Sequence, residues 1–158
     1  MQEWMTLKSQ SLVSLRDILE ILKSEGFFLS DWVLDIFERR QSKVFDEDIY
    51  LYKIPLRDIG VKGPVELGDV YLKFEESGYK LLDPQVALYI RQAYVNQPTG
   101  EWLRIAVPLD SMVDSDGIPH LPKLGSGLGR LYIETYWSWP NAIFHPHNEF
   151  IVSAIHNF

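Results

Sequence analysis

Two different spacings of apolar side chains in this sequence constrain its fold class more than any other feature. Near the N-terminus, Leu12, Leu15, Leu19 and Leu22 recur at the interval that places side chains on one face of a helix. Later segments, such as residues 49–54, alternate side chains as a half-buried strand does. Both periods in a chain of ordinary globular composition predict an α+β fold.

The N-terminal region predicts two helices with a short connection. Gly26 follows the leucine stripe as a stop signal, and Ser30 is placed to cap a second helix with Asp31 in its first turn. A short connection between two helices predicts a helical hairpin. The buried face of the second helix is expected to contain Trp32, Val33, Ile36 and Phe37.

The rest of the chain predicts strands, with one ambiguous segment. In residues 84–95, Asp83-Pro84 favours a helix start, whereas Val86, Leu88 and Ile90 also alternate as in a strand; we favour the helix. Residues 114–129, rich in Gly and Pro, predict a long loop. Strands are expected at residues 49–54, 70–75, 102–107, 131–137 and 150–155.

These elements predict a single domain over residues 1–158. We expect the N-terminal helical hairpin to pack on a mostly antiparallel sheet of about five strands, because consecutive strands with polar alternation favour antiparallel pairing. No repeat or low-complexity linker divides the chain.

Charge and composition narrow the classes of function. The chain has 15 basic and 22 acidic side chains and a net charge of −7, which argues against binding to nucleic acid or to an anionic membrane. The absence of cysteine excludes disulfides, thiolate metal sites and cysteine nucleophiles. Neither a secretory signal nor a long apolar run is visible, so we expect a cytoplasmic protein.

The C-terminal third is rich in aromatic side chains and poor in charge. Tyr and Trp anchor protein interfaces because they are large, stiff and amphipathic. The alternative for these side chains is core packing, since Trp is highly buried on average. The candidate partner-binding residues are Tyr132, Tyr136, Trp137, Trp139 and Phe144, and the expected partner is another protein.

One motif has the chemistry of a metal site. His145, His147 and Glu149 are spaced two apart, so on an extended segment they share one side, and two imidazoles with a carboxylate suit zinc or ferrous iron. His120 or His156 is a candidate for completing the site from another segment. The alternative is a plain solvated loop, because short motif matches have many false positives.

Two further motifs have simpler explanations. Asp114-Ser115-Asp116-Gly117 lacks the remaining ligands of a calcium loop and predicts a tight turn. The glycine-rich segment 125–130 leads into a strand rather than a helix, so it predicts a flexible connection, with a mobile lid as the alternative.

No catalytic motif is complete, so a binding function is favoured over an enzymatic one. We expect a small acidic protein–protein interaction module, monomeric or weakly dimeric, that binds through its C-terminal aromatic segment. The first alternative is a metal-dependent enzyme with zinc or iron, which is the only cofactor the sequence suggests. The second is an acidic decoy that occupies a basic surface of its partner.

Overall fold

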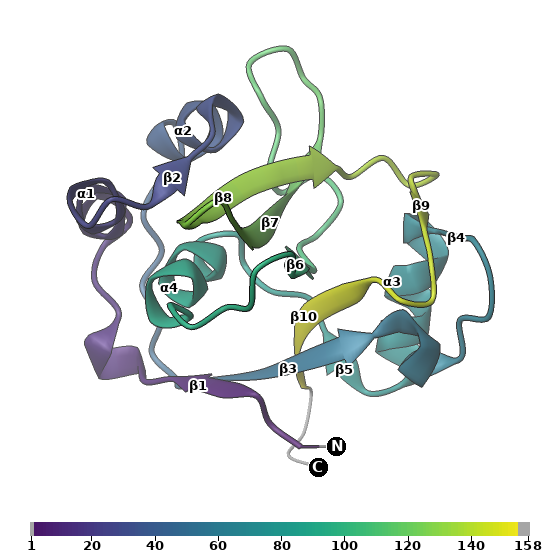
Figure 1. The fold of residues 1–158 in the computed structure, drawn as a ribbon. Coiled ribbons are helices and arrows are strands. Elements are labelled where there is room, and N and C mark those ends of the chain that lie inside the picture. The colour runs from purple at the N-terminus through teal and green to yellow at the C-terminus, as the bar shows by residue number, and fades with distance from the viewer. Residues whose placement is uncertain (1, 155–158) are drawn as a thin grey trace.

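The computed structural model describes residues 2–154, which form an α+β fold with four α-helices, a mixed eight-stranded sheet and a two-stranded sheet (Figure 1). The helices are α1 (Leu15–Ser24), α2 (Asp31–Glu38), α3 (Leu67–Glu76) and α4 (Val86–Ala93). The strands are β1 (Met5–Leu7), β2 (Phe28–Leu29), β3 (Ile49–Pro55), β4 (Val65–Glu66), β5 (Tyr79–Lys80), β6 (Trp102–Ile105), β7 (His120–Gly127), β8 (Arg130–Trp137), β9 (Ile143–Phe144) and β10 (Glu149–Ala154).

The large sheet has the order β1-β3-β10-β6-β7-β8-β2, with β5 added beside β10. Most neighbours are antiparallel, but β10 runs parallel to β6 and β2 runs parallel to β8. The sheet is mostly antiparallel, as expected, but it has eight strands rather than about five and includes two parallel pairings. The short strands that enlarge the sheet are stabilised by pairing with neighbouring strands. Segments of two or three residues are too short to show the alternation of apolar and polar side chains that predicts a strand.

The two N-terminal helices do not form the expected hairpin. Their caps are as predicted, since Gly26 has φ +83° after α1 and the Ser30 hydroxyl accepts from the Val33 N–H at the start of α2. The connection between them, however, joins the sheet: β2 pairs with β8 at Tyr132 and Ile133. As a result α1 packs against α4, and α2 packs against β8.

Residues 70–75, expected to be a strand, lie in α3. Leu67, Val70, Tyr71 and Phe74 are buried at the spacing of one helical face, whereas Leu72 is 55% exposed. Of the residues that suggested alternation, Val70 and Phe74 belong to this helical face, whereas Leu72 does not. The ambiguous segment 84–95 contains α4, as favoured.

Residues 114–129, expected to be a loop, contain β7. This strand pairs with β8 along its whole length, and the hairpin turns at Leu128 and Gly129, both with positive φ. One of the glycines that suggested a loop, Gly125, instead allows close packing. A Cβ on Gly125 would lie 2.2 Å from a ring atom of Trp102, so only glycine leaves room for that ring.

The remaining predicted strands correspond to observed ones. Residues 49–54, 102–107 and 131–137 overlap β3, β6 and β8, and 150–155 overlaps β10, with residue 155 outside the described part of the chain. The turn predicted at Asp114 is present, since the Asp114 carboxylate accepts from the N–H groups of Asp116 and Ile118.

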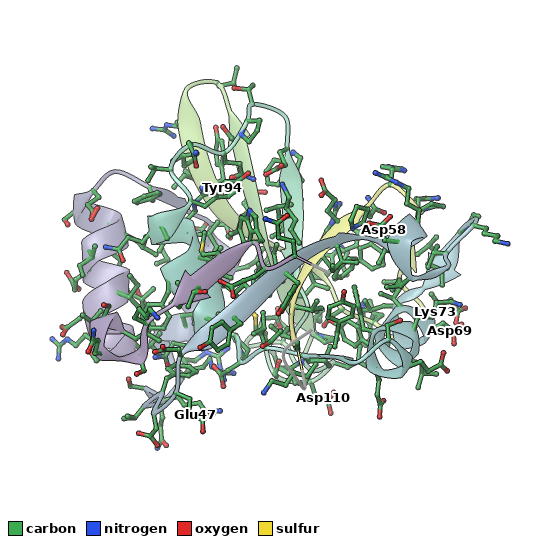
Figure 2. The ribbon with its side chains drawn as sticks, turned by 90° about the horizontal axis from the view of Figure 1, so that it is seen from below. Glu47, Asp58, Asp69, Lys73, Tyr94 and Asp110 are labelled. Atoms are coloured by element: carbon green, nitrogen blue, oxygen red, sulfur yellow. The ribbon has the colours of Figure 1, made fainter. Side chains whose placement is uncertain are left out.

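The helices lie on different parts of the sheet (Figure 1). α1, α2 and α4 lie toward the end formed by β8 and β2, whereas α3 lies with the small β4–β9 sheet beside β10. Figure 2 shows charged side chains such as Glu47, Asp58 and Asp69 at the outside of the molecule, consistent with their exposure. Leu67 and Leu124 are fully buried members of one core that includes residues from all four helices.

Candidate functional site

The predicted partner-binding aromatics lie in three different environments. Tyr132 and Tyr136 are half-buried on one face of β8, where Tyr132 contacts Phe28 and Trp102 and Tyr136 contacts Phe144. Phe144 itself is 1% exposed. It is therefore a core residue and offers no surface to a partner.

Trp137 and Trp139 lie at the surface, with 43% and 45% of their area exposed. A third tryptophan, Trp32, is 42% exposed, although the sequence analysis placed it in the buried face of α2. The rings of Trp32 and Trp137 lie edge to face with centroids 6.3 Å apart. We call Trp32 and Trp137 the tryptophan pair.

A buried histidine lies against both members of the tryptophan pair. His120, at the start of β7, is 1% exposed, and its ring centroid is 5.2 Å from that of Trp32 and 5.0 Å from that of Trp137. The register of the hairpin explains this position, because His120 is directly opposite Trp137. From the sequence, His120 was a candidate only for completing the metal site.

His120 connects two polar side chains through its ring nitrogens. Nε2 lies 2.8 Å from Oδ2 of Asp114, and Nδ1 lies 2.9 Å from Oγ1 of Thr135. The side chains of His120 and Asp114 are 1% and 0% exposed. These three residues form what we call the His120 relay.

The electrostatics of Asp114 favour its ionised form. Burial works against ionisation, but hydrogen bonds from His120 and from the N–H groups of Ile118 and Asp116 outweigh it, so the pKa of Asp114 is lowered from its usual 3.8. An ionised carboxylate only accepts hydrogen bonds. Nε2 of His120 is therefore the protonated nitrogen, and in the neutral ring Nδ1 accepts from the hydroxyl of Thr135.

The loop that supplies Asp114 is attached to α2. Both carboxylate oxygens of Asp35 accept hydrogen bonds from Ser115, from its hydroxyl at 2.7 Å and its N–H at 3.1 Å. Arg39 donates to the carbonyl of Val113 at 3.0 Å, and Arg40 donates to a neighbouring carbonyl of the same loop. These bonds hold residues 108–119 beside the tryptophan pair, where Figure 1 shows the connection from β6 to β7 next to α2.

A cavity of about 380 Å³ lies beside Trp32, which we call the α2–β8 cavity. Its lining includes two aromatic residues, Phe28 and Trp32, and two acidic residues, Asp31 and Glu134. Glu134 forms an ion pair of 3.8 Å with Lys123, and the guanidinium of Arg130 already lies 5.9 Å from the centroid of Phe28. Trp32 and Asp31 are therefore the groups that best suit an added cation. The residues that line the cavity are Phe28, Ser30, Asp31, Trp32, Glu134 and Thr135.

The proposed metal ligands His145, His147 and Glu149 are not gathered around one point in the described part of the chain. His145 and His147 are exposed and their rings stack 5.9 Å apart at 12°, which is contact between rings rather than convergence of nitrogens. Within residues 2–154, no three His, Asp or Glu side chains are grouped to hold a metal ion, and this includes Glu149. His120 is occupied in its relay, and His156 lies outside the described residues.

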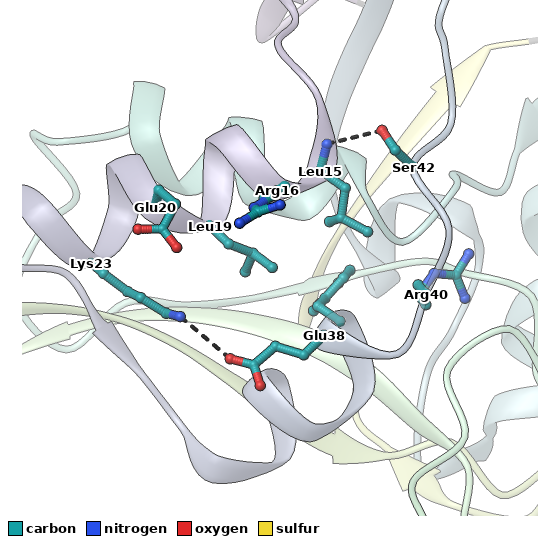
Figure 3. A pocket seen from close by; sticks show the side chains of 9 residues that line it. Leu15, Arg16, Leu19, Glu20, Lys23, Glu38, Arg40 and Ser42 are labelled. Atoms are coloured by element: carbon teal, nitrogen blue, oxygen red, sulfur yellow. Dashed lines mark hydrogen bonds and ion pairs between the residues drawn. The ribbon is translucent and has the colours of Figure 1, made fainter.

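A second cavity, of about 350 Å³, lies between α1 and the end of α2 (Figure 3). The apolar part of its wall is formed by Leu15, Leu19 and Phe37. Lys23 bridges the two helices through an ion pair of 3.3 Å with Glu38. The charged groups that rim this cavity are spread along the helices and do not converge on one point, so it has no evident chemistry.

The sequence contained partial signals for the site. Asp114 was identified as a turn former, and Trp137 as a candidate partner-binding residue with core packing as the alternative. Thr135 carried no signal, because a threonine within a strand is ordinary. Only the pairing of β7 with β8 and the attachment of the loop to α2 bring Trp32, Asp114 and Thr135 around His120.

No helix within the described residues is both long and apolar enough to cross a membrane. The chain matches no protein-family model, no curated protein and no solved structure.

Proposed function

We infer that this protein binds another protein through the tryptophan pair, with Trp139 extending the same surface. The observation that carries this proposal is the exposure of Trp32 and Trp137, 42% and 43%, in direct contact with each other. Large aromatic rings are costly to leave in water and are enriched among the residues that dominate binding energy at interfaces.

The α2–β8 cavity indicates the chemistry of the partner. Asp31 provides negative charge beside Trp32, and Glu134 adds a carboxylate that its ion pair with Lys123 partly neutralises. A Lys or Arg side chain of the partner therefore has both a cation–π surface and a counter-charge in this cavity. The net charge of −7 also favours the approach of a basic partner.

The test is capture of a partner by matched variants. Wild-type protein, the double variant Trp32→Ala/Trp137→Ala and the control Leu72→Ala are immobilised, and the bound proteins are compared after salt washes. Leu72 is a suitable control because it is an exposed apolar side chain, 55% exposed, on α3. We expect the double variant to lose a protein that the wild type and the control both retain.

Folding of the double variant is checked by circular dichroism, with Trp137→Tyr as a milder variant that keeps an aromatic ring against His120. Equal capture by all variants would contradict the proposal. The salt dependence of partner binding distinguishes this proposal from the acidic-decoy alternative. An aromatic anchor predicts a shallow loss of binding with salt, whereas a decoy that relies on net charge predicts a steep one.

A further inference from the structure

The His120 relay has the arrangement of an activated hydroxyl. Thr135 Oγ1 lies 2.9 Å from Nδ1 of His120, and Asp114 holds the opposite nitrogen at 2.8 Å. With Nε2 protonated, Nδ1 is free to accept the hydroxyl proton. A nucleophile, a base and a carboxylate that orients the base therefore lie in one chain of hydrogen bonds.

Thr135 is accessible from a cavity, unlike the other two members of the relay. It is half-buried and lines the α2–β8 cavity, whereas His120 and Asp114 are enclosed. The same wall contains the start of α2, where the Ser30 hydroxyl accepts from the N–H of Val33. The N–H groups of Asp31 and Trp32, at the first two helical positions, donate to no acceptor within residues 2–154. Free N–H groups at a helix start stabilise negative charge.

We propose that the protein hydrolyses small esters or thioesters that carry a cationic group, with Thr135 as nucleophile and His120 as general base. The cationic group is specified by the rings and carboxylates of the cavity, and the acyl group by the position of the Thr135 hydroxyl. This activity goes beyond protein binding but uses the same α2–β8 cavity that, in the proposed function, receives a basic side chain of the partner. A bound partner is therefore expected to compete with the cationic substrate.

The reaction divides into two balanced steps. In the first, Thr135 Oγ1 forms a bond to the acyl carbon, its proton passes to Nδ1 of His120, and the bond to the leaving alcohol or thiol breaks as that group takes the proton. In the second, water attacks the acyl-threonine and gives a proton to Nδ1. That proton returns to Thr135 as the carboxylic acid is released. Asp114 remains ionised and stabilises the imidazolium in both steps.

Acetylthiocholine is the probe, with the uncharged ester S-(3,3-dimethylbutyl) thioacetate as its isosteric control. The released thiol is measured with a thiol-reactive dye, and the chain adds no background because it has no cysteine. We expect turnover of acetylthiocholine above the rate in buffer, and a lower kcat/KM for the uncharged ester. Glu134→Gln should reduce this preference by lowering the kcat/KM for acetylthiocholine.

Thr135→Val keeps the shape of the side chain and removes the hydroxyl, so turnover should fall by about 100-fold or more. Thr135→Ser should retain measurable turnover and become acetylated at residue 135, detected as the mass of one acetyl group after rapid quenching. Leu72→Ala, distant from the cavity, should behave as the wild type. If Thr135→Val fails to fold, the serine variant and its acetylation still decide the role of the hydroxyl.

The inference is overturned if the wild type shows no turnover of acetylthiocholine, or if a folded Thr135→Val protein is as active as the wild type. Partner capture is measured on the same variants. Thr135→Val should capture a partner as the wild type does. A Thr135→Val protein that loses hydrolysis but keeps capture would therefore assign the loss to the His120 relay. Trp32→Ala/Trp137→Ala is expected to affect capture and hydrolysis together, because Trp32 lines the cavity and both rings contact His120, so Thr135→Val is the variant that separates the two activities.

Discussion

Two aromatic regions of this molecule differ sharply in how they are covered. Phe74, Phe144 and Phe150, from α3, β9 and β10, are 0–1% exposed, and the centroid of Phe150 lies within 5.9 Å of the other two. Trp32 and Trp137, from α2 and β8, contact each other just as directly but remain more than 40% exposed.

The difference arises from what surrounds each region. The three phenylalanines lie in the hydrophobic core with apolar side chains such as Val70, and α3 and β9 themselves supply Phe74 and Phe144. The tryptophan pair has instead a loop attached by polar contacts, from Asp35 to Ser115 and from Arg39 to Val113. Apolar burial is the larger source of stability, so the first region is expected to maintain the fold and the second to be available for binding.

The largest expected effect is in the phenylalanine region. Phe74→Ala removes a fully buried ring and should lower the free energy of unfolding by about 3–5 kcal/mol, measured by urea denaturation. Leu72→Ala, on the exposed side of the same helix, should change it by less than about 0.5 kcal/mol. A Phe74→Ala protein as stable as the Leu72→Ala protein would remove the distinction between the two regions.

A smaller effect is expected on the sheet face between the two regions. Gly125→Ala places a Cβ within 2.2 Å of the Trp102 ring, which must move, at a cost of about 1–3 kcal/mol. Gly127→Ala is the matched control on the same strand, because its Cβ meets nothing within 4 Å. Urea denaturation of both variants, with near-ultraviolet circular dichroism of the tryptophans, tests the prediction. Equal stability would mean that Trp102 repacks freely.

Single replacement of one exposed tryptophan should separate stability from binding. Trp137→Ala should change the free energy of unfolding by only about 1 kcal/mol, because the side chain is already partly in water. Its affinity for a captured partner should fall by about 2 kcal/mol or more. Calorimetric unfolding and a binding titration give the two values. A large loss of stability with unchanged affinity would assign Trp137 to the core instead.

The smallest effect is expected from acid. The pKa of Asp35 is lowered chiefly by hydrogen bonds from Ser115 and Arg39, and that of Asp114 by hydrogen bonds that outweigh its burial. A lowered folded pKa contributes stability above the unfolded value of 3.8, and this is lost as pH falls through the folded values.

These two groups therefore add no pH dependence between pH 7 and about pH 5. Below pH 3.8 we expect residues 108–119 to detach from α2 earlier than the phenylalanine region opens. Tryptophan fluorescence follows the first event and far-ultraviolet circular dichroism the second. Asp114→Asn should weaken the acid dependence of the fluorescence. Simultaneous loss of both signals in the wild type would show that the loop and the core open together.

The elements that the sequence did not predict are short strands, a glycine-containing strand and one helix. The caps at Gly26 and Ser30 were predicted because glycine conformation and side-chain capping act within a few residues. α3 was missed because its apolar residues fit both helical and strand spacing over six positions. β2 and β7 were missed because short or glycine-containing strands are stabilised by their neighbours, here β8.

In the candidate site, too, local sequence signals identified some residues and misplaced others. Trp137 was identified from its place at the end of an aromatic strand, whereas Trp32 was placed in the core because it follows a helix cap next to buried residues. The metal motif at His145 and His147 was suggested by spacing alone, as an alternative to a solvated loop, and in the structure these rings are exposed and stacked. Spacing reports which side chains share a side but not which atoms converge.

The sequence by itself determined the α+β class, the two helix caps, the strands with long regular alternation, and the absence of cysteine chemistry. These depend on local conformation and composition, which act within a few residues. The tertiary structure decided that β2 joins β8, that the Asp114 loop is held by α2, and that His120 lies between Trp32 and Trp137. Those contacts join residues up to about a hundred positions apart, and no local pattern encodes such pairing because it depends on how the whole sheet assembles.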